Sequence, residues 1–245
     1  MTFKVNNVNI NYVMYGDRNR STLVFLHGWG QNIEMMKKLA DNFKNRFNIL
    51  IIDLPGFGLS SEPTYAWSVY DYSDAVHNLI IHLKLQDISL IGHSFGGKVS
   101  IVYASKYNVN KMVLLASPFK KEVENLSLKT KILKFIMKVP GLKTLGNKMK
   151  KRMGSTDYRN ASDMMRNVLV KTVNTDVVDE AKKISCPTLL IWGTNDTAVS
   201  IKRAYELESL IKDSAVIKFE GASHYAYLER LNEVVNILNS FFGGN

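Results

Sequence analysis

The sequence of 245 residues has one cysteine, five prolines and no long apolar run, and these shortages exclude several classes of protein. Cys186 has no partner, so no disulfide can form within the chain. It precedes an expected strand, where a small apolar residue is expected to be buried. No run of about 18 apolar residues is present, which argues against a membrane-spanning helix. Residues 1–8 lack the apolar core of a signal peptide, and a cytoplasmic protein is therefore expected.

Acidic residues are also in short supply. The chain has 32 Lys and Arg against 22 Asp and Glu, which gives a formal net charge of +10. The segment from Lys120 to Arg152 contains eleven basic residues and two glutamates, so it holds nearly all of this excess. A basic segment can indicate a nucleic-acid binder. This one has no recognisable binding motif, and its one aromatic residue, Phe135, belongs to an apolar stripe. No nucleic-acid partner is therefore expected.

Hydrophobic residues make up 46% of the chain, enough for a sizeable core. Short apolar runs alternate with helical patterns, which predicts βαβ units and a mostly parallel central sheet flanked by helices. The expected strands are 8–15, 22–26, 48–52, 88–91, 112–115, 187–192 and 215–219. The expected helices are 34–43, 68–83, 98–107, 202–211 and 232–242. Ser68 is expected to cap its helix, with Asp71 as the partner in a capping box.

The alternation stops between about residues 117 and 183, where basic amphipathic helical patterns replace it. We therefore predict a core of residues 1–117 and 184–245, with a helical cap inserted at 118–183. Within it, 128–153 carries an apolar stripe separated by lysines. Three interpretations are open: a lid, reversible contact with an anionic membrane surface, and attraction of acidic substrates. The general richness of the chain in Lys, Asn and Ile favours a lid whose lysines face water.

The stretch Gly92–Gly96 fits the pattern G-x-S-x-G, with Ser94 at its centre. It lies after an expected strand and before an expected helix. A sharp strand-to-helix turn exposes a serine hydroxyl, and the small residues on either side relieve the crowding. Ser94 is therefore the predicted nucleophile, and a plain glycine-rich turn is the alternative.

A serine hydroxyl needs a positioned base. His224 lies between the last expected strand and the last expected helix, at the carboxyl edge of a parallel sheet, where sites in such folds gather. We predict that His224 is the base. The other four histidines are attributed to helix surfaces or local structure: His27, His77, His82 and His93.

The base needs an acid that fixes its tautomer. Asp196 follows the strand that ends near Trp192, so it is expected at the same sheet edge as His224. Asp176 and Asp179 are its rivals, but both fall in the insert. The order Ser94, Asp196, His224 is the order found in α/β-hydrolases. Asp196 is the predicted orienting acid, and an aspartate that only shapes a turn is the alternative.

Negative charge on a tetrahedral intermediate needs hydrogen-bond donors. The backbone N–H of Phe95, directly after the nucleophile, is one predicted donor. The backbone N–H of Trp29, in the loop after an early strand, is the other. The Phe95 assignment follows from the motif, whereas the Trp29 loop could also be a plain turn.

Five motifs in this order resemble the α/β-hydrolase superfamily: His27–Gly30, Asp53–Ser60, Gly92–Gly97, Trp192–Asp196 and Gly221–His224. The resemblance covers residues 1–117 and 184–245. It implies an oxyanion loop at Trp29, a lid in the insert, a structural role for Asp53–Ser60, and no cofactor. No metal site is expected. Haloalkane dehalogenases and epoxide hydrolases of this fold carry aspartate where this chain has Ser94, which argues against both activities.

The predicted function is hydrolysis of a carboxylic ester with an apolar acyl or alcohol part, so the expected partner is a small ester-like molecule. The same triad serves thioesterases, lipases, C–C bond hydrolases, proline iminopeptidases and perhydrolysis. A non-catalytic ligand-binding member of the fold is the alternative from another class, and the complete set of triad residues argues against it.

Overall fold

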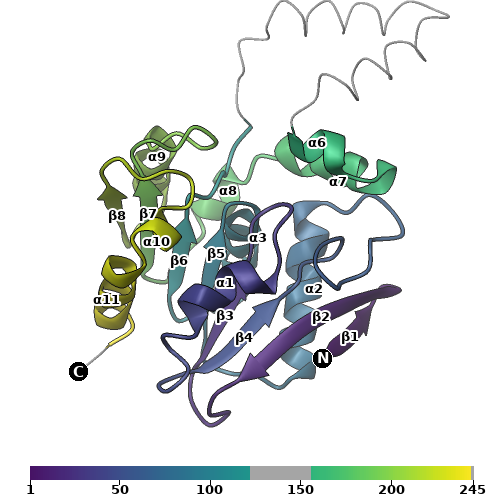
Figure 1. The fold of residues 1–245 in the computed structure, drawn as a ribbon, viewed down its shortest axis with the longest axis horizontal. Helices are drawn as coiled ribbons and strands as arrows, with labels where there is room; N and C mark the ends of the chain where they lie inside the picture. Colours follow the sequence, from purple (N-terminus) through teal and green to yellow (C-terminus); the bar gives the residue numbers. More distant parts are fainter. Residues whose placement is uncertain (122–155, 244–245) are drawn as a thin grey trace, which may run out of the picture.

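The structure, a computed structural model, describes residues 1–121 and 156–243. Its centre is an eight-stranded sheet in the order β1-β2-β4-β3-β5-β6-β7-β8 (Figure 1). The strands are β1 (Thr2–Val5), β2 (Val8–Tyr15), β3 (Thr22–Leu26), β4 (Asn48–Ile52), β5 (Ile88–His93), β6 (Met112–Leu115), β7 (Thr188–Gly193) and β8 (Ser214–Phe219).

Strands β4, β3, β5, β6, β7 and β8 run parallel, whereas β1 and β2 add an antiparallel edge. This confirms the predicted mostly parallel sheet. Every residue of β3, β4 and β5 is buried, as expected for strands covered on both faces. The register pairs Leu26 with Gly92 and His93 with Leu115, so the carboxyl ends of β3, β5 and β6 lie side by side.

Helices cover both faces of the sheet and enclose two apolar cores. Residues of α2 (Val69–His82), α3 (Phe95–Ala104), α8 (Val178–Ala181) and α9 (Lys202–Leu210) belong to one core. Residues of α1 (Ile33–Ala40), α10 (Ala226–Glu229) and α11 (Leu231–Phe241) belong to the other. The core therefore has three layers, with the helices packed against a buried sheet.

The helix predicted to begin at Ser68 has the expected cap. The Ser68 hydroxyl accepts from the Asp71 N–H, and the Asp71 carboxylate accepts from the Ser68 N–H at 2.6 Å. The helix expected at 98–107 begins and ends earlier in the structure: α3 spans Phe95–Ala104. Its first turn contains Gly96 and Gly97, and glycine is a poor helix former, so the sequence indicated a later start. Strand β1 and the four-residue α10 were not predicted.

The described part of the predicted cap is helical, with α6 (Thr156–Asn160), α7 (Asp163–Val173) and α8. Figure 1 shows α6 and α7 beyond one end of the sheet. Met165 of α7 packs against the loop after β4, where a Cβ on Gly56 would lie 2.3 Å from its sulfur. The apolar and basic stripe at 128–153 lies outside the described residues. Among the residues described, none forms a helix that is long and apolar enough to cross a membrane.

Candidate active site

Ser94 occupies the sharp turn between β5 and α3. Its backbone has φ of 49° and ψ of −113°, a region that residues other than glycine rarely adopt. The Ser94 N–H donates to the Leu115 carbonyl at 2.8 Å, which ties the turn to β6. A Cβ on Gly96 would lie 2.3 Å from the Leu26 carbonyl oxygen, so a larger residue would push α3 away from β3. The turn thus holds Ser94 half-buried at the carboxyl end of β5.

Asp196 and His224 meet from two different loops. Asp196 follows β7, and His224 lies between β8 and α10. The His224 Nδ1 is 2.7 Å from Oδ2 of Asp196, whose other oxygen accepts from the N–H groups of Ala198 and Val199 at 2.8 Å each. The Asp196 side chain is fully buried, whereas that of His224 is 16% exposed. Because a carboxylate only accepts, Nδ1 carries the proton, and Nε2 of a neutral His224 has a free lone pair.

The Ser94 hydroxyl makes no hydrogen bond to His224 or to any other residue in the described ranges. The two loops instead meet at the residue before the serine. Nε2 of His93 lies 3.1 Å from the main-chain oxygen of His224, and the two imidazole centroids are 4.9 Å apart. Ser94 and His224 therefore lie in adjoining loops, and in unliganded sites such catalytic contacts are often long.

The two predicted oxyanion residues are neighbours. The rings of Trp29 and Phe95 meet edge to face, with their centroids 5.5 Å apart. Phe57 completes the cluster, 4.8 Å from Trp29 and 6.3 Å from Phe95. Within residues 1–121 and 156–243, neither the Trp29 N–H nor the Phe95 N–H has an acceptor. Among the described residues, these two donors are therefore not used by the fold itself.

His27 and Asp53 have local roles in these loops. The His27 ring donates from Nδ1 to the carbonyl of the next residue at 2.7 Å, and its Nε2 accepts from the Leu54 N–H at 2.9 Å. Its burial lowers the pKa of His27 to about 4, so the ring is neutral. The Asp53 carboxylate accepts from the N–H groups of Ile33 and Leu59 at 2.7 and 2.9 Å. Both side chains therefore shape the loops around the site.

The rival aspartates are engaged elsewhere. The Asp176 carboxylate accepts from the Lys121 N–H, and Asp179 pairs with Lys182 at 3.0 Å. Their surroundings give neither of them the contact that Asp196 makes with His224.

Three residues near the site were missed by sequence reasoning. Oε1 of Gln31 accepts from the Gly28 N–H at 3.0 Å and so closes the turn that contains Trp29. Met165 reaches the loop after β4, as described above. Asp157 on α6 is close enough to His224 for their charges to interact; the surrounding protein raises the pKa of Asp157 although the residue is exposed, and His224 opposes this shift. The contacts of Met165 and Asp157 join segments that are distant in the sequence, whereas Gln31 bonds within its own loop, directly after the motif His27–Gly30.

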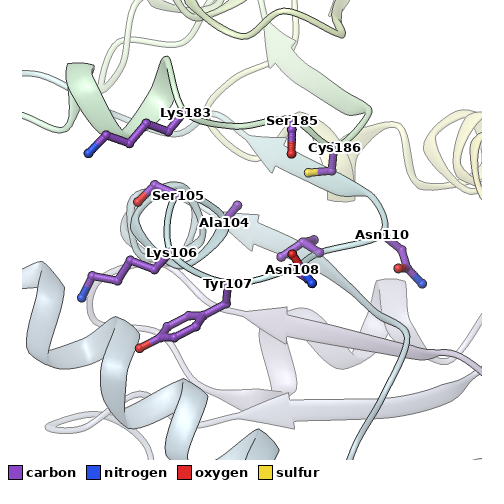
Figure 2. A pocket seen from close by; sticks show the side chains of 10 residues that line it. Ala104, Ser105, Lys106, Tyr107, Asn108, Asn110, Lys183, Ser185 and Cys186 are labelled. Carbon is purple, nitrogen blue, oxygen red and sulfur yellow. The ribbon is translucent and has the colours of Figure 1, made fainter.

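A pocket of about 430 Å³ lies at the opposite, amino edge of the sheet (Figure 2). It is bounded by the end of α3 and the loop up to Asn110 on one side, and by 183–186 before β7 on the other. Cys186 lies there, buried as predicted. The residues predicted for catalysis are absent from its walls. Among the described residues, no group of His, Cys, Asp and Glu side chains is arranged to hold a metal ion.

Comparison with known proteins places this arrangement in a family. The chain matches the family described as alpha/beta hydrolase fold over residues 21–141 and 123–231. Lipase 1 of Psychrobacter immobilis is 26% identical, covering 94% of this chain and 79% of that protein. AB hydrolase superfamily protein YisY of Bacillus subtilis is 26% identical, covering 89% and 90%. Among solved structures, the α/β hydrolase enzyme MGS-M2 from a deep-sea metagenome library is similar in fold, with a TM-score of 0.81 at 19% identity, covering 100% of this chain and 98% of that one. The chain, with its eight-stranded and mostly parallel sheet, belongs to the alpha/beta hydrolase fold family.

Proposed function

We propose that this protein is a serine hydrolase that cleaves carboxylic esters, with Ser94 as nucleophile, His224 as base and Asp196 as orienting acid. The observation that carries the proposal is the 2.7 Å contact between Nδ1 of His224 and the buried Asp196 carboxylate. It leaves Nε2 of His224 free to accept a proton, in a loop that adjoins the strained turn at Ser94.

In the acylation step, Oγ of Ser94 attacks the ester carbonyl carbon and His224 Nε2 takes the hydroxyl proton. The N–H groups of Trp29 and Phe95 stabilise the oxyanion of the tetrahedral intermediate, each contributing on the order of 3 kcal/mol. As the carbon–oxygen bond breaks, protonated His224 gives its proton to the leaving alcohol, and the acyl group stays on Ser94. Buried Asp196 stabilises the imidazolium throughout.

In the deacylation step, a water molecule takes the place of the alcohol. His224 removes one proton from it, the resulting hydroxide attacks the acyl carbon, and the proton returns to Oγ of Ser94 when the tetrahedral intermediate collapses. The products are a carboxylic acid, an alcohol and the regenerated serine.

The surroundings of the oxyanion residues favour an apolar substrate. Trp29 and Phe57 are half-buried aromatic residues next to Phe95, and Met165 is held against the neighbouring loop by α7. Such a lining stabilises an alkyl or aromatic group by burial, at roughly 25 cal/mol per Å². The name of the relative Lipase 1 is in line with this preference. We further propose that residues 118–183 form a cap above the site and influence which acyl groups enter.

The proposal is tested with p-nitrophenyl esters of increasing acyl length and matched thioesters. Turnover should occur, prefer an apolar acyl chain and disappear in Ser94→Ala. Ser105→Ala is the matched control, because the Ser105 hydroxyl donates to the Val102 carbonyl at the far end of α3. Turnover that survives in purified Ser94→Ala would contradict the mechanism, and preference for thioesters over esters would contradict the substrate class.

A further inference from the structure

His93, the residue before Ser94, has contacts that the proposed triad does not use. Its side chain is completely buried, and both ring nitrogens face oxygen atoms. Nδ1 lies 3.1 Å from Oε1 of Gln31, and Nε2 lies 3.1 Å from the main-chain oxygen of His224. One imidazole therefore touches the oxyanion loop, the nucleophile turn and the loop that carries the base.

The packing around His93 is tight on both sides. A Cβ on Gly28 would lie 2.8 Å from Nδ1 of His93, so the oxyanion loop rests directly on the ring. On the other side, the ring centroid is 4.9 Å from that of Tyr227 and 5.4 Å from that of Tyr225. The ring is thus held in one orientation, and its two nitrogens have fixed neighbours.

The two contacts of His93 cannot both be hydrogen bonds that the ring donates. Burial lowers the pKa of His93 to about 3, so the ring is neutral and carries one N–H. Oε1 of Gln31 already accepts the Gly28 N–H at 3.0 Å. In the described part of the chain, the His224 carbonyl has no main-chain donor, and His93 is its partner. Leaving this part-buried carbonyl without a donor against the buried His93 ring is costly, which favours the tautomer with the proton on Nε2.

We propose that His93 is a positioning residue of this site: its Nε2–H donates to the His224 carbonyl and fixes the base at its working distance from Ser94. This inference rests on the proposed function. Asp196 holds the side chain of His224, and the His93 contact acts on its main-chain carbonyl. Since His93 is bonded directly to Ser94, the link from nucleophile to base is short and rigid. Misplacement by about 1 Å costs roughly 100-fold in rate.

Three substitutions separate this role from simple packing. In His93→Gln the amide nitrogen can reach the position of Nε2, in His93→Asn it reaches only that of Nδ1, and His93→Phe keeps a ring without a donor. We expect Asn and Phe to lower kcat by roughly 100-fold with little change in KM, and Gln to keep most of the activity. His77→Gln is the matched control, because His77 lies on α2 against Tyr107, away from the site.

Two results from these variants would overturn the inference. If Asn keeps the activity and Gln loses it, the Gln31 contact is the important one. If all three variants lower Tm without changing kcat of the folded protein, His93 only fills space. Nitrogen NMR of ¹⁵N-labelled histidine in the full chain reads the tautomer without any turnover, and we expect the proton on Nε2 of His93. A proton on Nδ1 would overturn this inference alone, whereas a wild-type protein without Ser94-dependent turnover would overturn the proposed function.

Discussion

The loops at the carboxyl edge of the sheet and the helices α6 and α7 next to them are attached to the protein in different ways. The Asp196 carboxylate is fully buried and accepts three hydrogen bonds, and His93 is enclosed on all sides. By contrast, α6 has no buried residue, and contacts such as Ser162 with Glu62 are exposed. Helix α7 lies between these extremes, because its Met165 and Val168 belong to the core. The proposed reacting groups are therefore held by the core, and of the two adjoining helices only α6 has a surface position that can vary without disturbing them.

The largest effect on activity should come from removing the proposed reacting groups. Ser94→Ala and His224→Ala should each lower kcat by about 10⁶-fold, because the two side chains act as one unit. The double variant should be little worse than either single variant. Tm should change little, since neither side chain is part of an apolar core. Steady-state kinetics with calorimetry measures both quantities, and additive losses in the double variant would show that the residues act independently.

The next largest effect should come from the buried carboxylate. Asp196→Asn keeps the shape of the side chain but offers an N–H to Nδ1 of His224, which favours the wrong tautomer. We expect a loss of roughly 10⁴-fold in kcat, by analogy with the serine-protease triad. A loss of less than tenfold would mean that another carboxylate has the orienting role, and Asp157 would then be the first residue to substitute.

Acid should lower the free energy of unfolding, because buried histidines near the carboxyl edge of the sheet are neutral in the folded protein. The pKa of His27 is lowered by burial to about 4, against an ordinary value of 6.5, so the unfolded chain binds the proton more strongly between these values. The contribution of neutral His27 to the free energy of unfolding is fully present above pH 6.5. It falls as pH decreases toward 4, by about 3 kcal/mol. Urea unfolding should show that wild type and His27→Gln differ less in their free energy of unfolding as pH falls. A difference that stays constant would contradict the neutral, buried ring.

The smallest effect, on the free energy of unfolding, is expected where α3 contacts α7. Lys98 of α3 is buried, and its ammonium donates to the Thr172 carbonyl of α7 at 2.8 Å. Burial lowers its pKa from 10.5 to about 8, although Asp176 opposes the shift. Wild-type stability should therefore rise with pH between 8 and 10.5, because the unfolded chain binds more protons in that window.

Lys98→Met removes this charge and isolates its contribution. The stability of Lys98→Met relative to wild type should fall by about 2 kcal/mol between pH 7 and pH 10, as the wild-type lysine loses its proton. The absolute difference at pH 7 also includes the lost hydrogen bond to Thr172, about 1 kcal/mol. If the difference in stability between Lys98→Met and wild type does not depend on pH, burial of the charged lysine costs little free energy.

The sequence was sufficient for those features that depend on local pattern. Apolar runs predicted β3 through β7, because strands covered on both faces read as continuous hydrophobic segments. Strands β2 and β8, which are only partly buried, were also predicted. The spacing of Ser68 and Asp71 predicted a helix cap that the structure confirms. The motif around Ser94 predicted a strand-to-helix turn, and the structure has one at that residue.

Features that depend on contacts between distant segments could not be predicted. The contacts of His93 join residues that are 62 and 131 positions apart, and no spacing rule connects them. Lys98 was expected as the first residue of a helix, but α3 begins at Phe95, and Lys98 is buried against the Thr172 carbonyl of α7. Hairpin β1–β2 was missed because its turn, Asn6–Asn7, needs positive φ at two residues, which asparagine tolerates without the usual glycine.

Covalent labelling shows whether Ser94 is an activated nucleophile. A fluorophosphonate reacts with a serine only when a base removes the hydroxyl proton during attack. The wild-type chain should gain one adduct, mapped by peptide mass spectrometry to Ser94. Labelling should be lost in His224→Ala and retained in Ser105→Ala. An unlabelled wild-type protein, or an adduct on a residue other than Ser94, would contradict the account.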